Sequence, residues 1–166
     1  MDNILNAVEM CKKLNGQKMQ YIGRCLDLVW IGFGDLFERK SRGRTEKVAR
    51  YSLHIQCPFR VENKNNIFVG SRDLFIPASA EDTVVDLNKR ESTMFDSKIN
   101  LFNEKFNNET VANIELSGCG DLKIYLTNIN ITVFVDSSDD TEAWRLFRTN
   151  SEAEHLVVYG SGICFE

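Results

Sequence analysis

The chain has 166 residues, of which 43% are apolar and 27% are charged, and its net charge is −4 at neutral pH. These values are typical of one globular domain, here residues 1–166, whose folding buries roughly 70% of the surface of the open chain. The negative charge argues against a general nucleic-acid-binding protein. No stretch approaches the roughly 20 apolar residues of a membrane span, and Met1–Leu5 lacks a basic start, so we expect a cytoplasmic protein without a membrane partner.

Cysteine spacing argues against a structural metal site or a disulfide framework. The chain holds an odd number of cysteines, far apart and without a Cys-x-x-Cys pair: Cys11, Cys25, Cys57, Cys119 and Cys164. Structural zinc and disulfides both need paired cysteines at suitable spacing. We therefore expect buried, reduced thiols, no metal and no other cofactor.

Two segments have the pattern of amphipathic helices. Residues 3–14 carry an apolar stripe, with Asn3 as a candidate cap and Asn15-Gly16 as a stop signal. Residues 93–107 begin with Thr93 and Asp96 at the spacing of a capping box and should end near Asn107 and Asn108. Their apolar stripe is aromatic and falls at helical spacing: Phe95, Ile99, Phe102 and Phe106.

Residues 50–60 form the clearest predicted strand, because apolar and polar side chains alternate along them. Residues 19–33 are rich in strand formers, with Gly23-Arg24 as a possible bend between two strands. The basic segment 38–47 is predicted to be a long hairpin loop. Residues 78–92 are polar and look like a loop with at most one short strand.

The last third of the chain is predicted to be an antiparallel meander. Turn residues separate five short segments with strand character: 111–116, 122–126, 129–135, 143–148 and 156–159. The connections are too short for parallel crossovers. The fold class is therefore α+β, mainly one antiparallel meander or barrel-like sheet with an N-terminal and a central helix.

No motif commits the chain to a reaction, so we predict no catalytic residue. Gly160-Ser161-Gly162 lacks the spacing of a hydrolase elbow, and no glycine-rich loop has the pattern that binds phosphate. The acidic segment Asp136–Glu142 lacks the ligand spacing of a calcium loop. Cys57 follows His54 by three positions, an odd offset, so a regular strand places them on opposite faces.

Polar side chains on predicted strands are the remaining candidates for a binding site. His54 and its neighbours at alternate positions should share a face, and arginines recur on the segments that follow. The candidate binding residues are His54, Gln56, Arg60, Arg72, Asp73, Arg145 and Arg148. Several arginines on one face could bind a carboxylate, a phosphate or an acidic protein. The alternative is that this face is simply the solvated side of an antiparallel sheet.

Several short segments together resemble a group of small bacterial proteins that form a domain of unknown function. They are Ser52–Arg60, Val69–Leu74, Trp144–Arg148 and Gly160–Ile163. The resemblance implies a bacterial, cytosolic protein in which the polar strand face recurs. It implies no reaction.

We therefore carry two hypotheses about function. The first is a non-catalytic binding protein, for example an immunity-like protein that neutralises a toxin through its charged sheet face. The second is a small-molecule-binding protein or enzyme with a cleft around His54, Arg60, Arg72 and Asp73, where Asp73 could act as a base and the arginines could hold an anion. Exposed edge strands could also form a homodimer under either hypothesis.

Overall fold

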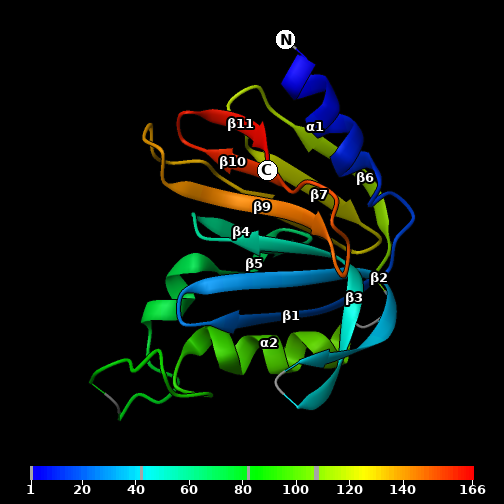
Figure 1. The fold of residues 1–166 in the computed structure, drawn as a ribbon. Coiled ribbons are helices and arrows are strands. Elements are labelled where there is room, and N and C mark those ends of the chain that lie inside the picture. The colour runs from blue at the N-terminus through cyan, green and yellow to red at the C-terminus, as the bar shows by residue number, and fades with distance from the viewer. Residues whose placement is uncertain (1, 42, 82, 107–108) are drawn as a thin grey trace.

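The computed structural model describes residues 2–41, 43–81, 83–106 and 109–166. Within these ranges the chain forms two α-helices, a short 3-10 helix and eleven strands, which make two separate antiparallel sheets (Figure 1). The predicted α+β class with mainly antiparallel strands is therefore confirmed. The described strands form two open sheets and do not close into one barrel.

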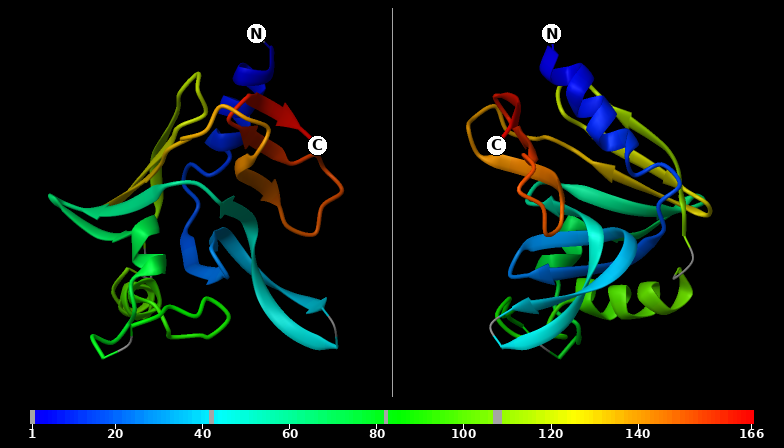
Figure 2. Two further views of the ribbon diagram at one scale, coloured as in Figure 1. Left: turned by 90° about the vertical axis from the view of Figure 1, so that its left-hand side faces the viewer. Right: turned by 45° about the vertical axis from the view of Figure 1, so that its right-hand side comes forward.

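The larger sheet has six strands and faces the viewer in Figure 1. Its order is β1 (Met19–Cys25), β2 (Leu28–Ser41), β3 (Arg44–Ile55), β9 (Glu142–Arg148), β10 (Leu156–Tyr159) and β11 (Gly162–Phe165). Strands β2 and β3 are much longer than their neighbours. Their far half therefore extends beyond the sheet as a two-stranded hairpin (Figure 2).

The smaller sheet lies behind the first. Its order is β5 (Asn66–Gly70), β4 (Phe59–Asn63), β8 (Ile129–Val133), β7 (Leu122–Leu126) and β6 (Val111–Leu116), and the 3-10 helix η1 (Ser71–Phe75) follows β5. The chain passes between the sheets at two corners, from β3 to β4 and from β8 to β9. Backbone hydrogen bonds join these corners, from Gln56 N to Ala143 O and from Phe134 N to Pro58 O, both at 2.8 Å.

The two helices lie against the outermost strands of both sheets. Helix α1 (Asp2–Lys12) contacts β6 and β11, and helix α2 (Met94–Lys105) contacts β1 and β5 (Figures 1 and 2). Each outermost strand of the two sheets therefore has a helix beside it. The aromatic stripe predicted for the central helix faces inward, since Phe95 and Phe102 are almost completely buried.

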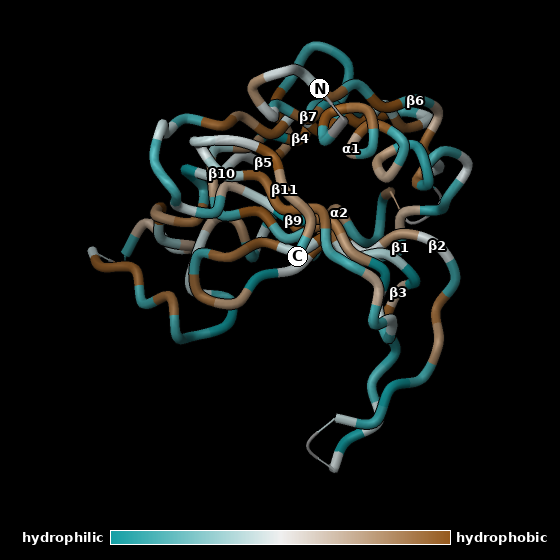
Figure 3. Tube along the Cα trace, turned by 45° about the horizontal axis from the view of Figure 1, so that its top comes forward, coloured by the Kyte–Doolittle hydropathy of each residue, from teal (hydrophilic) through white to brown (hydrophobic). Residues whose placement is uncertain are grey.

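The core is one continuous cluster between the sheets and the helices. The inward positions of the central strands supply most of it, and Trp144 is its largest fully buried side chain. The indole N–H of Trp144 donates to the carbonyl of Gly120 at 2.8 Å, so its polar atom is satisfied inside the core. In Figure 3 most apolar segments lie in the body of the molecule, whereas the outer part of the projecting hairpin is hydrophilic.

The helix ends agree in part with the sequence pattern. Thr93 and Asp96 form the predicted capping box, and Gly16 adopts the left-handed conformation with φ of 76°. Asn3 is not a cap; it lies within α1, and its amide donates to the carbonyl of Ile163 on β11. The predicted end of the central helix at residues 107–108 lies outside the described residues.

Three predictions about the strands are wrong. Segment 38–47 is strand on both sides of the hairpin tip rather than a long loop. The first hairpin turns after Cys25, at Leu26 with φ of 55°, and Gly23 lies inside β1. Residues 50–60 are not one strand, because the chain changes sheets around Pro58, which cannot donate to a ladder. In addition, the sequence pattern did not reveal β11.

Candidate functional site

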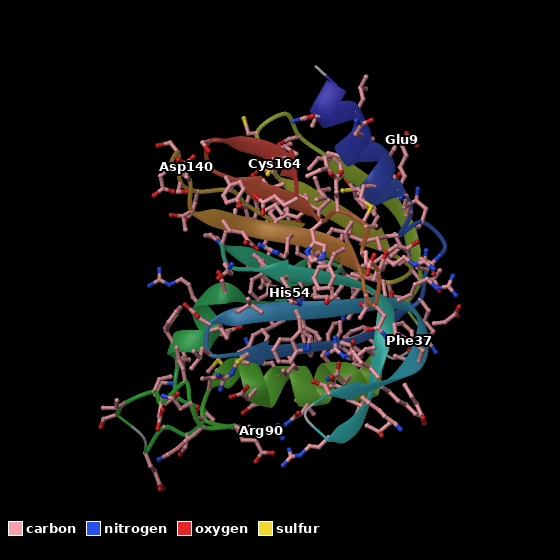
Figure 4. The ribbon with its side chains drawn as sticks, in the orientation of Figure 1. Glu9, Phe37, His54, Arg90, Asp140 and Cys164 are labelled. Atoms are coloured by element: carbon pink, nitrogen blue, oxygen red, sulfur yellow. The ribbon has the colours of Figure 1, made fainter. Side chains whose placement is uncertain are left out.

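A groove of about 490 Å³ opens on the outer face of the six-stranded sheet, under the projecting hairpin. We call this projecting part the arm; it comprises Leu36–Ser41 of β2 and Arg44–Ala49 of β3. The groove is lined by residues from the sheet and from the arm: Tyr21, Trp30, Arg39, Glu46, Lys47, Val48, Ser52, His54, Phe147 and Thr149. Figure 4 looks onto this face, with His54 near its middle and Phe37 on the arm.

Two aromatic rings lie over glycines of the neighbouring strand. Trp30 on β2 pairs with Gly23 on β1, and Tyr21 on β1 pairs with Gly32 on β2. A Cβ on Gly23 would lie 2.7 Å from the Trp30 indole nitrogen, and one on Gly32 would lie 2.5 Å from Tyr21 Cζ. Each ring therefore occupies the space that a side chain on its partner would need. The Tyr21 hydroxyl also accepts a hydrogen bond of 3.1 Å from the N–H of Ala49 at the base of the arm.

Three further rings continue this arrangement across the sheet. His54 on β3 contacts Phe147 on β9 edge-on, with 4.9 Å between ring centroids. Phe147 stacks on His155, which directly precedes β10, with 4.4 Å between centroids. Figure 4 shows His54 within this face. We call the five rings the ring row: Tyr21, Trp30, His54, Phe147 and His155. Five neighbouring segments of the sheet thus each contribute one ring.

Arg145 lies beside His54 in the strand register, and its charge is balanced locally. Its guanidinium donates two hydrogen bonds to the carboxylate of Glu142, the one from Nε at 2.6 Å. Its Nη1 lies 3.4 Å from Nδ1 of His155. Burial lowers the pKa of both histidines, and the positive charge of Arg145 lowers it further. Both imidazoles are therefore neutral at pH 7, and the ring row presents an uncharged aromatic surface.

Two cations of the arm, Arg39 and Lys47, line the groove, and Lys40 and Arg44 lie nearer the tip of the arm. Arg39 is paired with Glu46, with 2.6 Å between Nη2 and Oε1. Lys40, Arg44 and Lys47 form no ion pair with any described residue. These three side chains can therefore bind an anionic group without breaking an ion pair to a described residue.

Among the predicted site residues, only His54 lines this groove, and Arg145 lies beside His54 in the strand register. Gln56 and Arg72 instead line a smaller hollow of about 300 Å³ at the corner between the sheets. Arg148 lies at the end of β9 and lines a third hollow with residues of α1.

Arg60 and Asp73 are engaged elsewhere. Arg60 belongs to the five-stranded sheet, where its Nε lies 3.2 Å from Glu62 and its guanidinium covers the ring of Phe134. Asp73 accepts hydrogen bonds of 3.0 Å from Gly70 N and Lys98 Nζ, so its carboxylate holds η1 against α2. The cleft that the sequence suggested around His54, Arg60, Arg72 and Asp73 is therefore not assembled as one site.

The sequence pattern places Tyr21, Trp30 and Phe147 in predicted strands but does not mark them as site residues. The sequence does contain a signal for Tyr21 and Trp30. In both Tyr21-x-Gly23 and Trp30-x-Gly32 an aromatic residue precedes a glycine by two positions. In a two-stranded hairpin this spacing places each ring over the other strand's glycine, a pairing that covers exposed glycine backbone.

The described cysteines are all free thiols. Cys11 is buried as predicted, whereas Cys25 and Cys119 are exposed. Burial raises the pKa of the Cys57 thiol to about 12, with a further contribution from the charge of Asp136. Within the described ranges, no group of three or more histidine, cysteine or acidic side chains is arranged to hold a metal ion.

No described helix combines the length and the apolar character needed to cross a membrane. The chain matches no protein-family model, no curated protein and no solved structure.

Proposed function

We propose that this chain is a non-catalytic binding protein that docks an acidic partner protein on the outer face of its six-stranded sheet. The observation that carries the proposal is the meeting of the ring row with the cations of the arm at one groove. Aromatic side chains offer a large contact area with little conformational entropy to lose, and they are enriched at protein interfaces.

The distribution of charge supports an acidic partner. Residues 36–49 carry five basic and two acidic side chains, a net charge of +3 on a chain of net charge −4. The rest of the chain is therefore strongly acidic, so an acidic partner is attracted by the arm and repelled elsewhere. Such an asymmetry raises the rate of encounter and orients the partner.

The neutral histidines support the same proposal. A protonated imidazole next to Arg145 would need solvation and would oppose the burial of the ring row under a partner. Because both imidazoles are neutral at pH 7, the ring row can be covered without trapping unpaired histidine charges. The charge of Arg145 itself is balanced by Glu142.

Immunity-like neutralisation of a toxin is one function of this type, and we include it in the proposal together with a bacterial, cytoplasmic setting. An immunity-like protein needs a docking surface and no catalytic group. The ring row and the arm meet that requirement without any contribution from the separate positions of Arg60, Arg72 and Asp73.

Site-specific photocrosslinking in the native host tests this proposal. A benzoylphenylalanine at Ser52, which lines the groove, is compared with one at Asn130, on the outer face of the five-stranded sheet. We expect position 52 to crosslink a protein through an acidic segment, and position 130 to crosslink nothing reproducibly. Equal crosslinking at both positions, no crosslink at position 52, or crosslinked segments without acidic residues would each contradict the proposal.

Rings and cations on a sheet could also bind single-stranded nucleic acid. The net charge of −4 favours a protein partner. If nuclease treatment abolishes the crosslinks at Ser52, or if an oligothymidine binds the groove with an affinity that Trp30→Ala removes, the partner is a nucleic acid and the proposal fails.

A further inference from the structure

The arm is a two-stranded ribbon whose two long edges have no neighbouring strand in the described part of the chain. Residues from Leu36↔Ala49 to Ser41↔Arg44 pair with each other. The pairing of β1 with β2 ends at Phe33, and the pairing of β9 with β3 ends at Tyr51↔Arg148. Isolated two-stranded ribbons are marginally stable in water, so an added strand would stabilise the arm.

The free edge of β3 borders the groove. The N–H of Thr149 makes a last backbone hydrogen bond to Arg50 O at 2.9 Å. The chain then turns away at Asn150, which has the left-handed φ of 55°. Strand β9 therefore does not continue beside the arm, and this edge of β3 has no neighbouring described strand. Glu46, Lys47 and Val48 line the groove next to this edge.

The backbone groups on this free edge can be identified. Only two residues separate Ser41 from Arg44, so this last pair of the hairpin exchanges backbone hydrogen bonds. Along an antiparallel ladder such pairs alternate with pairs that do not exchange them. In Lys40↔Thr45 and Glu38↔Lys47, the residues Thr45 and Lys47 therefore direct their N–H and C=O groups away from β2.

We infer that the partner adds an extended acidic segment as a new strand along the free edge of β3, opposite Thr45 and Lys47. The inference rests on the proposed function and specifies how the partner is held. Main-chain hydrogen bonds provide affinity in this mode, and side-chain contacts at alternate positions provide selectivity. Here the selective contact is Lys47, which lies on the same face of the arm as Thr45 and forms no ion pair with a described residue.

Two other readings of the arm lead to different outcomes. Charged side chains on an exposed edge also prevent unwanted strand pairing, in which case nothing binds there. A second copy of the chain could pair with the same edge, but two arms of net charge +3 repel each other. An acidic segment is the occupant whose charge complements the arm.

The test uses a synthetic peptide of alternating threonine and glutamate, with a lysine-for-glutamate peptide as control, and measures affinity by fluorescence anisotropy. Thr45→Pro removes the N–H that faces the free edge, and Thr45→Ala is its matched control. Lys40→Pro acts on the opposite edge, on β2, and Lys40→Thr is its control. We expect Thr45→Pro to weaken binding of the acidic peptide about tenfold relative to Thr45→Ala. Lys40→Pro should match Lys40→Thr.

Amide hydrogen exchange of the unmodified protein provides a second measurement that does not depend on the folding of a proline variant. Exchange at Thr45 and Lys47 should slow when the acidic peptide is added. Equal binding by Thr45→Pro and Thr45→Ala, or unchanged exchange at both amides, would overturn the inference. Dimers in sedimentation that protect the same amides without peptide would also overturn it, in favour of a second copy.

The proposed function and this inference fail in different ways. If Trp30→Ala and Lys47→Glu weaken binding of the crosslinked partner but Thr45→Pro does not, the docking face stands and the added strand is wrong. If none of the three variants weakens it, both are wrong. Absence of peptide binding up to about 1 mM, with no change in amide exchange, counts against the added strand.

Discussion

Arg24 and Asp96 form a buried ion pair, with 2.7 Å between Nε and Oδ1 and side chains only 6% and 10% exposed. The guanidinium also donates to the carbonyls of Leu26, Leu87 and Lys89. One side chain therefore ties β1 to the start of α2 and to the loop that precedes α2. This contact fixes the edge of the sheet on which the rings of Tyr21 and Trp30 lie.

Arg24→Met should destabilise the protein by about 3–5 kcal/mol, because it leaves the buried Asp96 carboxylate without its cation. Urea unfolding followed by circular dichroism measures the loss. Arg39→Met is the matched control, since the pair of Arg39 with Glu46 is about half exposed and contributes little. Equal stability of the two variants would show that the Arg24 pair does not hold the loop.

Gly32→Ala should destabilise the protein by about 1–3 kcal/mol, the usual cost of overpacking. The new methyl group would lie 2.5 Å from Tyr21 Cζ and 2.8 Å from the Ala49 Cβ, so the ring must leave the sheet face. Gly118→Ala, where nothing lies within 4 Å, is the control and should change stability little. A neutral Gly32→Ala variant would contradict the close cover of glycine by the tyrosine ring.

Acidification should destabilise the fold through the two histidines. Burial, then the charge of Arg145, lowers the pKa of His54 and of His155 in the folded protein, while Glu142 acts in the opposite sense on both and Glu166 on His155. The unfolded chain, with a histidine pKa near 6.5, therefore binds more protons, and stability falls as pH drops below about 6.5. NMR titration of the imidazole protons checks the cause, and urea unfolding at several pH values checks the effect.

His54→Gln should reduce that pH dependence between about pH 6.5 and 5, because one of the two titrating rings is lost. Carboxylates titrate mainly below this window, so they mask little of the change. An imidazole of His54 that titrates at or above pH 6.5 in the folded protein would contradict the assignment.

The central helix could be predicted from sequence because its signals are local. Thr93 and Asp96 satisfy the first amides, and Phe95 and Phe102 fall on one face. The arm could not be predicted as strand for a physical reason. Over Glu38–Ser41 and Arg44–Lys47 no residue of the hairpin is buried, so both faces meet water and the charged residues show no alternation with apolar ones.

The ring row depends on topology rather than on local pattern. His54 and Phe147 are neighbours only because β9 pairs with β3, and this pairing joins segments far apart in the chain. The same dependence explains why the prediction that Arg60 shares a face with His54 is wrong. Alternation along one strand puts it with His54, but the change of sheet at Pro58 carries it to the opposite side of the core.

The most direct test of the docking surface compares charge reversal on the two sheets. Lys47→Glu changes the arm beside the groove, and Lys123→Glu changes a lysine on the outer face of the five-stranded sheet, which lies over the ring of Tyr125. Affinity for the crosslinked partner is measured by calorimetry. The proposal predicts that Lys47→Glu weakens binding about tenfold or more while Lys123→Glu leaves it unchanged. Equal effects of the two reversals, or an effect of Lys123→Glu alone, would contradict it.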